Sequence, residues 1–194
     1  MMNRKILIGI AAALALSGCI SFGAKPPPTL LTLTADATMP AGTSRTVGPG
    51  ESVTILVPRV PAALATNRVP VQSDDTNLAY VKDAQWVEPP SQLFRALLSE
   101  TIAAKTGRVV LDARQFTFDP GVRISGELSQ FGIDASAMEA VVTYDAARSV
   151  GDRVEERRFQ ARVPVSEVEA GSVGVALNQA ANRVAGEVAA WIGG

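Results

Sequence analysis

The chain has 194 residues, of which 47% are hydrophobic and 19% charged, which suits a single globular domain with a short additional segment. Its 18 basic and 19 acidic residues give a net charge of -1, which excludes the strong positive field that nucleic-acid binding requires. The absence of histidine excludes Ser-His-Asp and Cys-His catalysis, and a single cysteine excludes an internal disulfide.

The N-terminus has the pattern of a secretory signal peptide. Arg4 and Lys5 precede an uncharged apolar run over residues 6–16. This run is shorter than the roughly 20 residues that a membrane-spanning helix needs, and its length is typical of the apolar region of a signal peptide. No later segment is long and apolar enough to span a bilayer, so the sequence predicts a signal peptide over residues 1–18.

A lipidation site follows the apolar run. Residues 16–19 read LSGC, and a leucine with two small residues before a cysteine resembles the lipobox of bacterial lipoproteins. The alternative is a plain signal peptide, or a short anchor, with an incidental cysteine. The only cysteine of the chain occupies the required position. We therefore expect cleavage between Gly18 and Cys19, and a covalent lipid on Cys19 whose acyl chains include palmitate.

The residue after the cysteine bears on which membrane holds the protein. In enteric bacteria an aspartate there tends to retain a lipoprotein in the inner membrane, whereas Ile20 favours a periplasm-facing attachment to the outer membrane. Without Arg4 and Lys5 the 18 basic residues fall to 16 against 19 acidic ones, so the lipid must provide the attachment. Residues 19–29 contain three consecutive prolines and predict a short, stiff tether.

Residues 30–194 are expected to form one domain with two main amphipathic helices. The first covers residues 89–106, with prolines in its first turn and Gly107 just past its end. The second covers about five turns near the C-terminus. Their apolar stripes are formed by Leu93, Phe94, Leu97, Leu98 and Ile102, and by Val173, Leu177, Ala180, Ala181, Val184, Val188, Trp191 and Ile192.

The remaining patterns predict strands. Alternation with a period of two over residues 121–165 predicts an antiparallel meander, with a bulge near Phe131 and a turn at residues 147–152. Short extended runs lie at residues 30–34, 52–57, 68–72, 78–81 and 108–111, with one helical turn at residues 62–64. The predicted fold class is α+β, with a mostly antiparallel sheet and both helices packed on one face.

Charged clusters offer few candidates for chemistry. Asp74 and Asp75 could ligate a cation, but their neighbours have the composition of a solvated turn. Residues 155–158, with the sequence EERR, could dock a partner, but alternation along a strand favours a charged edge or solvent-facing surface. The sequence predicts no catalytic residue, no metal site and no cofactor besides the lipid.

Residues 77–90 form the most distinctive internal segment, with a Trp-x-Glu-Pro run directly before the first helix. One interpretation is a strand, a turn and a helix start, with Trp86 in the core. The other is an exposed contact, since tryptophan and tyrosine are favoured anchors at interfaces. We retain Tyr80, Trp86 and Glu88 as candidate partner contacts.

This segment resembles the ABC-type transport auxiliary lipoprotein family, which includes the paraquat-inducible lipoprotein. The lipobox and the long C-terminal helix fit the family as well. Two features depart from it: residues 31–33 lack the family's aromatic residue, and Pro70 interrupts a strand, which suggests an edge strand. The residues that match its most specific motif are Asn77, Tyr80, Trp86, Glu88 and Pro89.

The resemblance implies a non-enzymatic accessory protein. Members accompany an ABC permease, its ATPase and a periplasmic protein with a mammalian-cell-entry-type domain, and the assembly moves lipids or other hydrophobic molecules between membranes. The lipoprotein would tether or receive the periplasmic partner at the outer membrane, and some members form rings, so a homo-oligomer is compatible with the family. The alternative function is a lipid-binding carrier. An open apolar cavity between helices and sheet would favour the carrier, and a closed core with a surface patch the tether.

Overall fold

The computed structural model describes residues 29–48, 50–112 and 121–193. The predicted signal peptide with its cleavage site between Gly18 and Cys19, and the tether as far as residue 28, lie outside the described residues. The domain has the α+β fold that the sequence predicts. Its elements in chain order are β1 (Val53–Ile55), η1 (Ala62–Leu64), β2 (Arg68–Gln72), β3 (Leu78–Gln85), α2 (Pro90–Thr106), β4 (Val110–Leu111), β5 (Val122–Asp134), β6 (Glu139–Val150), β7 (Arg153–Pro164) and α3 (Ala170–Gly193).

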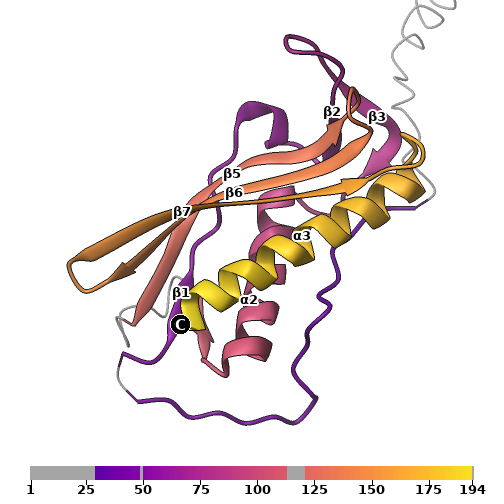
Figure 1. Cartoon of the computed structure of the whole chain (residues 1–194). Coiled ribbons are helices and arrows are strands. Elements are labelled where there is room, and N and C mark those ends of the chain that lie inside the picture. Colours follow the sequence, from indigo (N-terminus) through magenta and orange to yellow (C-terminus); the bar gives the residue numbers. More distant parts are fainter. Residues whose placement is uncertain (1–28, 49, 113–120, 194) are drawn as a thin grey trace, which may run out of the picture.

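Strand β5 is the centre of a seven-stranded mixed sheet (Figure 1). On one side it pairs antiparallel with β6, which pairs antiparallel with β7, so the predicted meander is confirmed. On the other side its start pairs in parallel with β1 and its end in parallel with β2, and β4 and β3 extend these two branches. Most of the paired residues are antiparallel, as predicted, since the parallel registers cover only two or three residues each. The parallel pairs arise because connections that cross over bring β1 and β2 beside β5 in the same direction.

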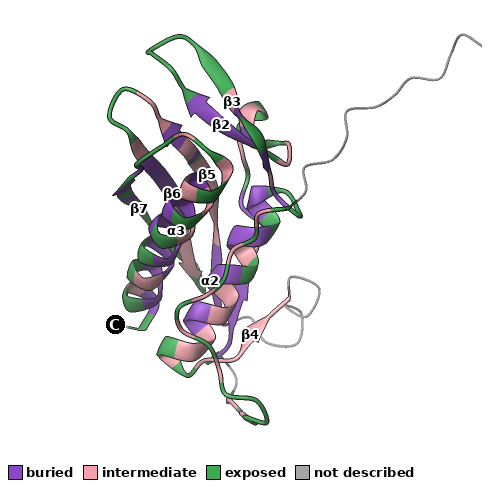
Figure 2. Ribbon diagram, turned by 90° about the vertical axis from the view of Figure 1, so that its right-hand side faces the viewer, coloured by how far each residue is buried: buried purple, intermediate pink, exposed green. Residues whose placement is uncertain are grey.

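Both helices cover the same face of the sheet, and Figure 2 shows their buried sides turned towards the strands. Helix α2 packs against α3, and α3 lies over β6 and β7. The ring of Phe94 in α2 lies 5.2 Å from that of Tyr144 in β6 and 6.5 Å from that of Phe131 in β5. Gly107 ends α2 with a φ of 73° and donates its N–H to the carbonyl of Ala103, as its place after the apolar stripe predicts.

Three local predictions were wrong. Residues 30–34 form no strand, since only Leu31 pairs, through a single bridge to Trp86. The turn between β6 and β7 consists of Gly151 and Asp152 alone, because the strand pairing continues through Val150 and Arg153. Strand β2 lies between β3 and β5 rather than at an edge.

Two further features explain local irregularities in the pattern. The bulge expected near Phe131 is confirmed by a register shift between Leu128 and Gln130. Pro70 is tolerated inside the sheet because the pairing with β3 shifts its register between Arg68 and Pro70.

Candidate functional site

Trp86 lies in the core, which agrees with the first of its two interpretations and removes it from the candidate partner contacts. Its side chain is 0% exposed, and its ring lies 5.4 Å from that of Phe131. The chain places it there because Trp86 is flanked on both sides: its N–H donates to the carbonyl of Asn67, and it bridges to Leu31 on the other side. The indole Nε1 has no hydrogen-bond partner among the described residues.

Tyr80 and Glu88 are accessible, in contrast to Trp86. Tyr80 is half-buried, with the guanidinium of Arg68 4.1 Å from the centre of its ring and its hydroxyl 3.4 Å from the carbonyl of Ala63. Glu88 is exposed just before α2. The two residues flank Trp86, so the surface they could form lies along the end of β3 and the start of α2.

A large bulge in β3 lies between them, and no pattern in the residues predicted it. Arg68 pairs with Gln85 and Pro70 pairs with Tyr80, so three additional residues of β3 have no counterpart in β2. Asp83 adopts a φ of 56° there, which is uncommon for a residue other than glycine. Lys82 and Asp83 are exposed, so the bulge presents two opposite charges beside Tyr80.

Residues 30–45, which follow the proline-rich segment, are hydrogen-bonded to both helices, and we call them the anchor strap. Asn182 of α3 accepts the N–H of Asp36 at 2.8 Å and donates to the carbonyl of Thr34 at 2.8 Å. Asn178 accepts the N–H of Thr34 at 2.9 Å, and Glu100 of α2 accepts that of Met39. In the sequence, the only sign of this contact is Asn182, a polar residue between the apolar positions of α3. Its side chain is 8% exposed in the structure.

We expect Asn182→Ala to lower the free energy of unfolding by about 1–3 kcal/mol, because it leaves partly buried backbone groups of the strap without partners. Urea unfolding of the purified mature chain measures this. Asn178→Ala is the matched control: it removes one solvent-exposed bond, so its effect should stay below about 1 kcal/mol. Equal effects of both variants would show that the strap adds no stability through Asn182.

The acidic pair at residues 74–75 lies in the turn between β2 and β3. The carboxylate of Asp74 accepts hydrogen bonds from the side chain of Asn77 and from the backbone N–H groups of Thr76 and Asn77. These bonds, led by the Asn77 side chain, lower the pKa of Asp74 to about 2. The carboxylate therefore stabilises its own turn. Within residues 29–48, 50–112 and 121–193 there is no group of three His, Cys, Asp or Glu side chains that could hold a metal ion.

The charged cluster at residues 155–158 is engaged with its own domain. Glu155 accepts a hydrogen bond from the indole of Trp191 at 2.9 Å and pairs with Arg148 at 2.8 Å. Arg158 forms an ion pair with Asp145 of the neighbouring strand. These contacts join the β6–β7 hairpin to the end of α3, which agrees with a solvent-facing charged surface.

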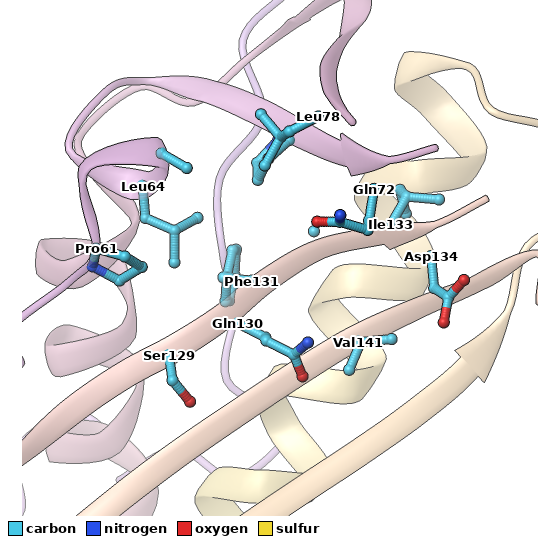
Figure 3. A pocket seen from close by; sticks show the side chains of 13 residues that line it. Pro61, Leu64, Gln72, Leu78, Ser129, Gln130, Phe131, Ile133, Asp134 and Val141 are labelled. Carbon is cyan, nitrogen blue, oxygen red and sulfur yellow. The ribbon is translucent and has the colours of Figure 1, made fainter. Parts of the chain in front are cut away.

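Among the described residues, aromatic side chains pack the interior between the helices and the sheet. Trp86, Phe94, Phe131, Tyr144 and Phe159 are each at most 1% exposed, and the rings of the first four form a continuous series of contacts. Burial raises the pKa of the Tyr144 phenol, whose hydroxyl donates to the carbonyl of Ser125. A hollow of about 320 Å³ opens instead on the opposite face of the sheet, beside η1 and β2 (Figure 3).

Comparison with known proteins gives a family match over almost the whole domain. Residues 31–189 match the family described as ABC-type transport auxiliary lipoprotein component. The sequence matches none of the curated proteins. Among the described residues, no helix has the length and apolar character needed to cross a membrane.

Two solved structures share the fold. Protein XCC0632 from Xanthomonas campestris, described as a member of family DUF330, is 18% identical, with a TM-score of 0.66 over 84% of this chain and 94% of that one. An uncharacterised protein is 15% identical, with a TM-score of 0.64 over 76% of this chain and 96% of that one. At these identities the likeness shows the fold alone.

Proposed function

The chain belongs to the ABC-type transport auxiliary lipoprotein component family, and we propose that it is a non-enzymatic tether that holds a periplasmic partner of an ABC lipid-transport system at the outer membrane. Its membership makes it a membrane-anchored lipoprotein associated with ABC transporter components. The finer statement, that the partner carries a mammalian-cell-entry-type domain and that the cargo is a lipid or another hydrophobic molecule, is part of the proposal.

The packed interior is the observation that favours a tether over a lipid-binding carrier. A carrier that sheltered its cargo between the helices and the sheet would need a cavity there, whereas aromatic rings occupy that space. Surfaces remain for a partner along the end of β3, where Tyr80, Lys82, Asp83 and Glu88 are accessible. This arrangement supports a protein that works by contact.

The anchor strap gives the tether a mechanical basis. The strap begins 11 residues after the predicted lipid site at Cys19, and its backbone is bound to α3 through Asn178 and Asn182. Leu31 packs so closely on α3 that a Cβ at Gly174 would lie 2.8 Å from its Cδ2. A pull that reaches the strap is therefore transmitted to the helices and to the sheet that they cover.

The proposal is tested by fractionating envelopes from cells with and without the lipoprotein. We expect the mammalian-cell-entry-type partner to co-sediment with the outer membrane only when the lipidated protein is present. An exported but unlipidated form should bind the partner and release it from the outer membrane. If the partner sedimented identically in all three cells, the tether function would be wrong.

We expect Tyr80→Ala to weaken binding of that partner roughly thirtyfold, the effect of losing an interface anchor worth about 2 kcal/mol. The side chain is half-buried, so folding should survive, and the melting temperature is measured beside the affinity. Val154→Ala in β7 is the control, because Val154 is exposed and β6, β5 and β2 separate β7 from β3 in the sheet. Unchanged affinity in Tyr80→Ala would remove the end of β3 as the contact surface.

A further inference from the structure

The outer face of the sheet, opposite the helices, carries an apolar hollow. Its floor is formed by β5 and β6, and its walls by η1 and the β2–β3 hairpin (Figure 3). Val141 lies on this floor: it pairs with Gly132 and Arg162, while its neighbours Ala140 and Val142 belong to the core. Val141 is nevertheless only 4% exposed, so an apolar side chain is buried on the otherwise polar face.

The β2 wall stands close to the floor because of a glycine. A Cβ at Gly132 would lie 2.4 Å from the carbonyl oxygen of Pro70, so any larger residue would push β2 away from β5. Leu64 of η1 and Leu78 of β3 are part of the apolar lining. Leu78 remains 44% exposed, so the hairpin leaves an apolar side chain open at the rim.

The polar side chains at this hollow are engaged by the protein itself. The amide of Gln72 donates to the carbonyl of Asp74 at 2.6 Å, and the amide oxygen of Gln130 accepts from the hydroxyl of Thr143 at 2.8 Å. Asp134 accepts from Ser136 and pairs with Arg162. A polar ligand would have to compete for these groups, whereas a hydrocarbon needs none of them.

Size and charge narrow the ligand further. A cavity that holds one benzene measures about 150 Å³, so a hollow of about 320 Å³ accepts roughly twice that amount of carbon, about twelve atoms. The lining of the hollow is apolar at one end, where Pro61 and Leu64 lie. It is polar at the opposite end in Figure 3, where Gln72 and Asp134 lie. There the single guanidinium of Arg162 faces two carboxylates, Asp134 at 3.3 Å and Glu139 at 3.1 Å, an excess of negative charge.

We propose that this hollow binds one alkyl chain of a zwitterionic amphiphile, with the chain beside Leu64 and Val141 and the headgroup beside Asp134. An anionic headgroup would be repelled by the excess carboxylate at that end. The site is independent of the tether, because it lies on the outer face of the sheet and needs no partner protein. The occupant is a free amphiphile of this kind.

The test is isothermal titration calorimetry of the mature chain carrying Cys19→Ser, with lauroyl-lysophosphatidylcholine below its micelle-forming concentration. We expect saturable binding at one site, and binding at least tenfold weaker in Leu78→Asp and in Val141→Phe, which charge the rim and fill the floor. Val87→Asp is the matched control, since Val87 is 48% exposed outside the hollow, and should bind normally. No saturable binding, or equal loss in Val87→Asp, would overturn the proposal.

One further arm completes the test. Lauroyl-lysophosphatidylglycerol has the same chain and an anionic headgroup, and should bind several-fold more weakly; equal affinity would refute the assigned headgroup position. The partner-sedimentation experiment can succeed or fail whatever these titrations give.

Discussion

Replacing Trp86 by alanine is expected to lower the free energy of unfolding by about 3–5 kcal/mol, a large part of the stability of a domain of this size. The side chain is 0% exposed and packs on Phe131, so its removal leaves a cavity beside β5, just after the end of β3. Urea unfolding of the mature chain measures the change. Partner binding, assayed well below the lowered melting temperature, should remain.

Trp86→Phe is the matched control for this prediction. It keeps most of the packed ring and removes the indole Nε1, which has no hydrogen-bond partner among the described residues. An unpaired buried donor costs about 1–3 kcal/mol, so its removal offsets much of the lost volume, and the net change should be small. If Trp86→Ala instead abolished partner binding and left stability unchanged, the assignment of Trp86 to the core would be wrong.

Those parts of the fold that depend on local pattern were predictable. Helix α2 was found almost to the residue, because its prolines, its apolar spacing and Gly107 all lie within one short segment. The meander of β5, β6 and β7 was also evident, since each strand carries its own alternation and follows its neighbour through a short turn.

What the sequence could not provide depends on contacts between distant segments. The parallel pairing of β1 and β2 with the two ends of β5 leaves no periodic signal in such short runs. The strap was misread as a strand because residues 30–34 have strand-forming side chains, yet their backbone groups are bound by Asn178 and Asn182, more than a hundred residues later. The burial of Trp86 was ambiguous for the same reason: the motif gives only the spacing of its residues, whereas burial depends on residues that are distant in sequence.

The lipid site, in contrast, is predicted from a local motif alone, since a peptidase and an acyltransferase recognise a few consecutive residues. Each buried methylene of an acyl chain contributes about 0.8 kcal/mol, and stable anchoring takes two signals, such as two chains. The mature body is mildly acidic and gains nothing from anionic lipid. The lipid on Cys19 is therefore expected to provide the whole of the membrane attachment.

We predict that Cys19→Ala blocks both lipidation and cleavage after Gly18, so that the precursor keeps residues 1–18 and fails to reach the outer membrane. Mass spectrometry of the N-terminus and membrane fractionation measure the two effects. In the companion variant, a cleavable signal peptide without a lipobox replaces residues 1–19, and the body should then appear in the soluble periplasmic fraction. Because the domain itself is unchanged in that variant, a body that still sedimented with the outer membrane would have to bind it through its own surface. That result would refute the lipid as the sole anchor.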